Sequence, residues 1–300
     1  MSSKIIERSA MENKYRREWE RLETSKPRPE RARTVIKMDY QEFKEKVQRQ
    51  EDLFVESIVG ALYGGDAYLI KGAFPKDFMI DLRKKVHKYW QGKPSEFYKM
   101  LEGSPDFHRI IDPEIGKKYS LRLCKHSCYF YPWNDDPLKL FGAIYERWRV
   151  VKFLMGLRPN EYEKNTPKDG VVDRIQIVQY PPRVGFLEPH SDPYLHQRLF
   201  FSGYMSKRGV DYQGGGFYLV GPGDKVVEVE DQIDVGDICI GYATVYHGVA
   251  PIDRHKEPKW ELDDGRWFLS MYSNASDEVP NRHIGHPVKL SIKGVMPDEY

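Results

Sequence analysis

Cysteine is scarce in this chain of 300 residues, which contains only Cys124, Cys128 and Cys239. A low, odd count fits a reducing compartment better than a disulfide framework, so we expect a cytoplasmic protein. Cys124 and Cys128 flank His126 on a segment that alternates like a strand, which would place all three side chains on one face. Because a structural zinc normally needs four ligands, we expect ordinary buried thiols here.

An excess of charge of one sign is also missing. The 47 Lys and Arg residues nearly balance the 45 Asp and Glu residues, and the net charge is +2. No global field would therefore draw the chain to nucleic acid or to an anionic membrane. No apolar run approaches the ~18 residues of a membrane span, and the first residues lack the apolar core of a signal peptide. We expect neither nucleic acid nor a membrane as a partner.

The residues that are present suffice for a large core. Apolar residues make up 40% of the chain, and 14 Phe and 20 Tyr residues contribute much of their volume. We expect a helical N-terminal extension over residues 1–62 and one domain over 63–300. The extension begins with a charged, helix-prone segment that Pro27 and Pro29 end, and a second helical stretch covers about 40–62.

The first part of the domain predicts a strand and two helices. Residues 67–72 form a short apolar run, which leads into a helix with apolar residues at every fourth position from Phe78 to Trp90. Asp136-Pro137 predicts the start of another helix, since an N-cap is followed by Pro at the first helical position. We expect that helix to end near Gly156.

From residue 171 onward, short alternating segments recur between turn residues. The predicted strands are 173–180, 198–205, 216–220, 225–230, 237–242 and 266–273. Regular short strands separated by Gly and Pro indicate an antiparallel β-sandwich or barrel. The expected fold class is therefore α+β, with helices first and a β-rich core at about 171–275.

Two histidines and an aspartate stand out in this core. His190 and Asp192 are two residues apart, so their side chains point the same way from an extended segment. His247 follows a predicted strand that would bring it to the same inner face. Two imidazoles and one carboxylate form the triad that holds a non-haem Fe(II) and leaves coordination positions open. Each residue alone also has an ordinary explanation, as a core histidine or a turn aspartate.

The whole series resembles the iron(II)- and 2-oxoglutarate-dependent oxygenases, particularly their prolyl-hydroxylase-like branch. The resemblance rests on this triad, on the Gly-rich turn and strand at 213–220, and on the strand that begins at Arg266. It implies a double-stranded β-helix core, of the jelly-roll or cupin-like kind. It further implies that His190, Asp192 and His247 bind Fe(II), that 2-oxoglutarate and O2 are co-substrates, and that ascorbate can stimulate turnover.

By the same resemblance, Arg266 matches the residue that pairs with the distal carboxylate of 2-oxoglutarate. A planar guanidinium binds a carboxylate through two parallel hydrogen bonds. Tyr180, Gln176 and Ser270 are further candidates for co-substrate binding. Arg266 follows His247 by 19 residues, later than in many relatives, and Arg254 lies in the insertion between them. Arg254 therefore remains a rival anchor.

The resemblance implies an oxygenase that hydroxylates an unactivated C–H bond and releases succinate and CO2. Tyr272 stands where the nucleic-acid demethylases of this superfamily carry a second Arg. We therefore expect a small polar metabolite as the substrate, such as an amino acid or another carboxylate. The alternatives are a protein or peptidyl hydroxylase and a cupin-like metal-binding protein without oxygenase activity. The sequence does not indicate an oligomeric state.

Overall fold

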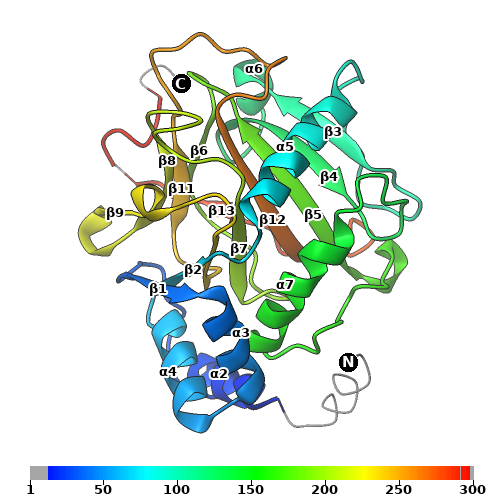
Figure 1. The fold of residues 1–300 in the computed structure, drawn as a ribbon. Helices are drawn as coiled ribbons and strands as arrows, with labels where there is room; N and C mark the ends of the chain where they lie inside the picture. The colour runs from blue at the N-terminus through cyan, green and yellow to red at the C-terminus, as the bar shows by residue number, and fades with distance from the viewer. Residues whose placement is uncertain (1–12, 291, 298–300) are drawn as a thin grey trace.

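A computed structural model describes residues 13–290 and 292–297 and places one 13-stranded sheet at the centre of the molecule (Figure 1). One half contains β1 (Val35–Asp39), β2 (Ala67–Lys71), β3 (Phe107–Ile111), β4 (Leu123–Phe130), β5 (Val171–Tyr180), β7 (Leu199–Tyr204), β10 (Ile238–Tyr242) and β12 (Arg266–Ala275). The other half contains β6 (Phe186–Ser191), β8 (Gly216–Val220), β9 (Val226–Glu228), β11 (His247–Ala250) and β13 (His286–Pro287). Strand β4 joins the halves, because it pairs with both β5 and β6.

The chain alternates between these two halves from β5 to β12. Strands β5, β7, β10 and β12 lie in the first half, and β6, β8 and β11 lie between them in sequence but in the second half. All the pairs within this core are antiparallel. This is a double-stranded β-helix, and it confirms the α+β class. The six strands predicted after residue 171 are all present, and so is the predicted strand at 67–72.

Alternation along β5 and β12 decides what each face of the sheet contacts. The two strands pair over ten residues, from Arg266 opposite Tyr180 to Ala275 opposite Val171. Odd-numbered residues such as Ile177 and Leu269 belong to the main hydrophobic core together with residues of the helices. Even-numbered residues, including Arg266 and Tyr180, therefore point to the opposite face, between the two halves of the sheet.

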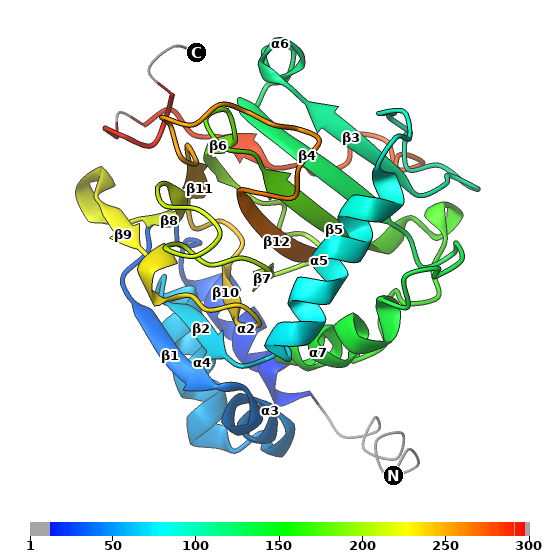
Figure 2. The ribbon, with the colours of Figure 1, turned by 45° about the horizontal axis from the view of Figure 1, so that its top comes forward.

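Two long helices cover the outer face of the first half. Helix α5 (Lys76–Trp90) crosses β12, β5 and β4, and α7 (Phe141–Leu154) lies beside it (Figure 2). The predicted apolar stripe of α5 is confirmed, since Leu82, Val86 and Trp90 are buried. Helix α7 begins at Phe141 and not at Asp136 as predicted. The backbone of Lys139 is left-handed, with φ 53°, which interrupts a helix. The Asp136 carboxylate instead accepts hydrogen bonds from the N–H groups of Leu140 and Phe141.

The N-terminal segment contributes three helices, which lie below the sheet in Figure 1, and one strand at the edge of the sheet. The helices are α2 (Lys14–Ser25), α3 (Tyr40–Arg49) and α4 (Asp52–Tyr63). The helical stretch predicted at 40–62 is thus two helices, because Gln50 adopts a left-handed conformation with φ 51°. Strand β1 was not predicted, and it pairs in parallel with β2 at the edge of the sheet. The part of the predicted extension before residue 13 lies outside the described residues.

The remaining helices are short. They are α6 (Pro113–Gly116) and the 3-10 turns η2 (Pro167–Asp169), η3 (Pro222–Asp224) and η4 (Glu230–Gln232). Among the residues that the structure describes, no helix is both long enough and apolar enough to span a bilayer. Cys124, Cys128 and Cys239 are buried free thiols, as expected.

Candidate metal centre and co-substrate cavity

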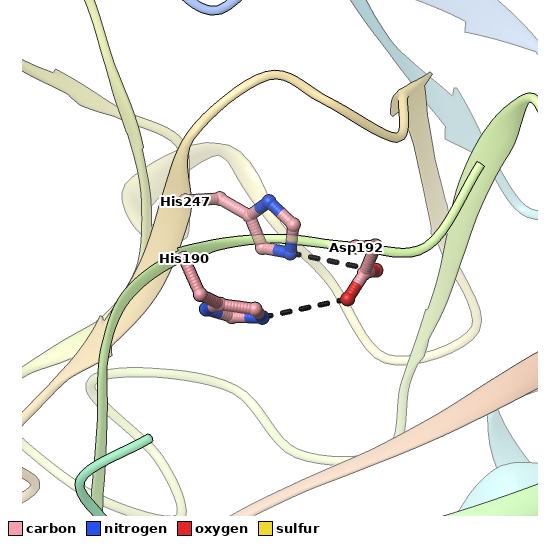
Figure 3. A group of neighbouring side chains, drawn as sticks. All are labelled: His190, Asp192 and His247. Carbon is pink, nitrogen blue, oxygen red and sulfur yellow. Dashed lines mark ion pairs between the residues drawn. The ribbon is translucent and has the colours of Figure 1, made fainter. Parts of the chain in front are cut away.

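The fold brings His190, Asp192 and His247 together. His190 lies near the end of β6, and His247 begins β11, where the two histidines are register partners. Their ring centroids are 4.4 Å apart. Asp192 follows β6 by one residue and turns back toward both rings (Figure 3). The predicted convergence of the three side chains is therefore confirmed.

The ligating atoms of the three side chains face one another. Nε2 of His190 is 3.5 Å from Asp192 Oδ1, and Nε2 of His247 is 3.7 Å from Asp192 Oδ2 (Figure 3). One ligand atom from each residue lies within 4.8 Å of the other two. Within the described part of the chain, no other group of three His, Cys, Asp or Glu side chains meets this criterion. In particular, His196 does not join the cluster.

Backbone carbonyls orient both imidazoles. Nδ1 of His190 lies 3.0 Å from the carbonyl oxygen of Glu188, and Nδ1 of His247 lies 2.8 Å from that of Val245. A carbonyl can only accept, so each Nδ1 carries the proton and each Nε2 presents its lone pair to the cluster. This arrangement is typical of metal-binding histidines.

The electrostatics of the cluster suit a cation. Burial, reinforced by the neighbouring His190, lowers the pKa of His247 to about 4, so its ring is neutral near pH 7. Burial alone would raise the pKa of Asp192, but the neighbouring His190 and His247 side chains outweigh burial and lower that pKa. A neutral imidazole and an ionised carboxylate are the protonation states that bind a metal.

The cluster opens into a cavity between the two halves of the sheet. Its lining combines the triad with aromatic, apolar and polar side chains: Tyr180, Leu187, Phe200, Ser202, Phe217, Gly248, Val249, Arg266, Phe268, Ser270 and Tyr272. Arg266, Tyr180 and Ser270 were predicted to bind the co-substrate, and all three lie here together with the triad.

Arg266 is buried and ion-paired, which the sequence did not predict. Its Nε and Nη2 donate to the two carboxylate oxygens of Glu230, at 2.9 and 3.2 Å. Glu230 also accepts from the Tyr212 hydroxyl and from the N–H of Phe217. Among the described residues, no acceptor takes a hydrogen bond from the other amino group of Arg266, Nη1. Glu230 thus holds the guanidinium in place and leaves one of its edges available.

Tyr180 provides a second unused donor. Its hydroxyl is fully buried without a hydrogen-bond partner among the described residues, and the guanidinium carbon of Arg266 lies 5.9 Å from the centre of its ring. Buried polar groups are nearly always paired, so this hydroxyl indicates a missing ligand. Ser270 donates to the carbonyl of Phe201, and Gln176 donates to Ser127. The co-substrate roles of Gln176 and Ser270 stay predictions.

Arg254 lies elsewhere and has other contacts. Its Nη2 donates to the carbonyl oxygens of Gly294 and Met296, and it is absent from the cavity lining. Of the two arginines considered as co-substrate anchors, Arg266 is therefore the one in the same cavity as the triad.

Three side chains near the lining residues of this cavity were not predicted from the sequence: Glu230, Lys125 and Arg174. Glu230 could not be found from spacing, because only the fold brings it to Arg266 from 36 residues away. Arg174 could have been predicted from the sequence, since it lies two residues before the candidate site residue Gln176 and shares the inward face of β5 with it.

The residues fit the groups that the resemblance implies. Two imidazoles and a carboxylate on one side are the donor set of non-haem Fe(II) sites. Among the described residues, the Tyr180 hydroxyl and Nη1 of Arg266 have no acceptor, and a carboxylate would accept from both.

Comparison with known proteins gave structural matches only. No protein-family model and no curated protein sequence matches the chain. Similar solved structures include JOX2 in complex with 2OG, Fe and JA, at 15% identity and a TM-score of 0.49 over 88% of this chain and 80% of that one. A Pseudomonas putida prolyl-4-hydroxylase is 12% identical, with a TM-score of 0.44 over 69% of this chain and 91% of that chain. A putative 2OG-Fe(II) oxygenase family protein from Caulobacter crescentus is 12% identical, with a TM-score of 0.43 over 81% and 87% of the two chains.

The solved structures similar to this chain thus include iron- and 2-oxoglutarate-dependent oxygenases, and at these identities the likeness concerns the fold. The chain itself has a double-stranded β-helix with a His-Asp-His metal cluster and a buried arginine in one cavity.

Proposed function

We propose that this protein is an Fe(II)- and 2-oxoglutarate-dependent dioxygenase that hydroxylates a C–H bond of a small polar metabolite and releases succinate and CO2. One observation carries the proposal: the His-Asp-His cluster and the free edge of Arg266 line the same cavity. A metal-binding protein without oxygenase activity has no need for a guanidinium buried beside its metal.

Each side chain has a defined task in this proposal. His190, Asp192 and His247 hold the iron on one side and leave the cavity side open for ligands. The bound iron supplies the redox chemistry that activates O2 at the expense of 2-oxoglutarate. Arg266 donates through Nη1 to the far carboxylate of 2-oxoglutarate, and the Tyr180 hydroxyl donates to the same group.

The apolar side chains exclude water from the reacting centre. Phe200 and Phe217 are buried, and their rings lie 4.9 and 5.8 Å from the His247 ring. Exclusion of water by these rings strengthens the electrostatic contacts in the cavity and protects reactive species from side reactions.

The substrate, partners and location are part of the proposal. The cavity lies between the two halves of the sheet and is lined largely by buried side chains, which supports a small molecule over a folded protein as the substrate. The nearly balanced charge argues against nucleic acid or an anionic membrane as a partner. Three free buried thiols support a location in the cytoplasm.

The test is succinate formation by the purified protein with Fe(II), 2-oxoglutarate and O2. The wild type should convert 2-oxoglutarate slowly alone and faster with its substrate, and Asp192→Ala should abolish both rates. Succinate formation by Asp192→Ala at the wild-type rate would refute the ligand assignment. Absence of succinate from the wild type, despite tight Fe(II) binding, would favour the non-oxygenase alternative.

A further inference from the structure

A second cationic region lies on the inward face of the sheet, at the other end of β5 from Tyr180. Arg174 is the register partner of Tyr272, and Tyr180 is the register partner of Arg266. Six residues of a strand span roughly 20 Å. Arg266 lines the cavity together with Tyr272 and the triad, and Arg174 lies next to the lining, in contact with the Tyr272 ring.

Arg174 lacks the partners that a charged side chain in a protein normally has. No carboxylate of the described residues forms an ion pair with it, and its Nε is buried without a hydrogen-bond partner. Its guanidinium makes one long contact, 3.4 Å from Nη2 to Gln176 Oε1. A buried donor left unpaired costs free energy and is uncommon in native proteins. The acceptor for this guanidinium is therefore not among the described residues.

Two aromatic rings hold Arg174 in position. Its guanidinium carbon lies 4.9 Å from the ring centre of Tyr272 and 5.3 Å from that of Tyr129. Tyr272 also lines the cavity that contains the triad. Tyr272 therefore connects the triad to Arg174.

Lys125 adds a second cation to this region. It lies on β4 two residues before Ser127 and shares that residue's inward face. It is half-buried and forms no ion pair with the described residues. Its ammonium is close enough to Arg174 and Asp192 for both charges to act on it, in opposite directions. Two cations beside the cavity that form no ion pair with the described residues suit an anionic ligand.

We propose that Arg174, assisted by Lys125, binds a carboxylate group of the substrate to be hydroxylated. This inference rests on the proposed function and names the part of the site that recognises the substrate. A planar guanidinium whose Nε edge is free can donate two parallel hydrogen bonds to a carboxylate. The rings of Tyr129 and Tyr272 restrict the guanidinium, and the rest of the substrate extends past Tyr272 toward the triad.

Each arginine binds one of the two acidic ligands, Arg266 the 2-oxoglutarate and Arg174 the substrate. Arg266 is ion-paired to Glu230, so its one free edge suits a single carboxylate deep in the cavity. Arg174 has no such partner among the described residues, so its charge is available to the second ligand. A substrate without an anionic group would leave the Arg174 Nε unsatisfied, which gives the site a means of discrimination.

The test uses three matched probes of nearly equal shape: 3-phenylpropanoate, its neutral amide, and the cationic 3-phenylpropylamine. Dissociation constants are measured by ligand-observed NMR on protein loaded with Zn(II) and saturating 2-oxoglutarate, which occupies the Arg266 end. The carboxylate should bind about tenfold or more tightly than the amide, as expected for a charge-assisted hydrogen bond, and the amine should not bind.

Variants then assign the effect to Arg174. Arg174→Met should weaken carboxylate binding about tenfold, Arg174→Lys should restore part of the loss, and Lys125→Met should weaken it less. Arg49→Met, which removes an exposed cation on α3, is the matched control and should bind like the wild type. Thermal melting of each variant checks that it is folded.

The outcomes separate this inference from the proposed function. Equal carboxylate binding by wild type and Arg174→Met, or tighter binding of the amide or amine, would overturn the inference. If 2-oxoglutarate fails to bind with Zn(II), the proposed function is in error instead. The probe titration would then be repeated in the Arg266→Met/Glu230→Gln background, where loss of carboxylate binding on Arg174→Met still supports the subsite and its retention overturns it.

Discussion

Arg266 and Glu230 form a doubly hydrogen-bonded ion pair in the interior, with both side chains almost fully excluded from solvent. Burial opposes a charge on the guanidinium, but the Glu230 carboxylate outweighs it and raises the pKa of Arg266. The arginine is therefore a fixed cation whose direction is set by its acid partner. A ligand can therefore form hydrogen bonds only with the edge of the guanidinium that Glu230 leaves free.

Arg266 should determine the affinity for 2-oxoglutarate. Arg266→Met alone would leave Glu230 buried without its cation, so the informative variant is Arg266→Met/Glu230→Gln. We expect its dissociation constant for 2-oxoglutarate, with Zn(II) bound, to rise about tenfold to a hundredfold, because one charge-assisted contact is lost. Calorimetry measures this value. Arg254→Met is the matched control, and a larger effect there would make Arg254 the anchor.

Glu230→Gln should destabilise the protein, because Arg266 would remain buried and charged without its counter-ion. Breaking a buried pair in this way costs about 3–5 kcal/mol. Urea unfolding of the metal-free protein measures the loss. 2-Oxoglutarate with Zn(II) should stabilise Glu230→Gln more than wild type, since the ligand supplies a carboxylate to the orphaned cation. A stability within about 0.5 kcal/mol of wild type would show that the pair carries little energy.

The three predicted ligands should each be necessary for metal binding. We expect His190→Ala, Asp192→Ala and His247→Ala to weaken Fe(II) or Mn(II) binding about a hundredfold or more, since two remaining ligands no longer enclose an ion. Calorimetry under anaerobic conditions measures the affinity. His196→Ala, close in sequence but outside the cluster, should bind like the wild type. Wild-type affinity in any of the triad variants would exclude that residue as a ligand.

Tyr180→Phe should affect stability and co-substrate affinity in opposite directions. The Tyr180 hydroxyl is buried and unpaired, so its removal should leave the ligand-free protein equally or slightly more stable. Its loss should weaken 2-oxoglutarate about threefold to tenfold, the value of one neutral hydrogen bond. Tyr218→Phe removes another buried, unpaired hydroxyl from outside the cavity lining and should leave affinity unchanged. Unchanged affinity in Tyr180→Phe would remove this hydroxyl from the site.

His126 should make the protein sensitive to acid. Burial first, and then the charge of His108, lower its pKa to about 3, whereas an unfolded histidine titrates near 6.5. Between these values the unfolded state binds more protons, so stability falls as pH decreases from 6.5 toward 3, by at most about 1.4 kcal/mol per pH unit.

The matched variant for this prediction is His126→Gln, which cannot titrate. Between pH 7.5 and pH 5.0 the wild type should lose about 2 kcal/mol more than the variant, as measured by urea unfolding at both values. Equal losses would show that His126 is protonated in the native state, or that its ring is not buried in solution.

Local patterns in the sequence determined much of the fold. Alternation predicted β5, β7, β8, β10 and β12, because a strand with one buried face repeats every two residues whatever lies beyond it. The apolar stripe of α5 was predicted from an equally local pattern, the spacing of its apolar residues. The start of α7 was not predictable, since the left-handed Lys139 is a single backbone choice that composition does not encode.

The sequence also determined which residues form the metal cluster. His190 and Asp192 share a face because of their spacing, and the chemistry of imidazole and carboxylate limits what they bind. Only the tertiary structure decided the contacts among segments far apart in the chain. The placement of His247 opposite His190, of Glu230 on Arg266, and of Arg174 between Tyr129 and Tyr272 each depends on which strands pair and in which register. Strand pairing is a long-range choice, made by burial of the whole core, and no spacing along the chain specifies it.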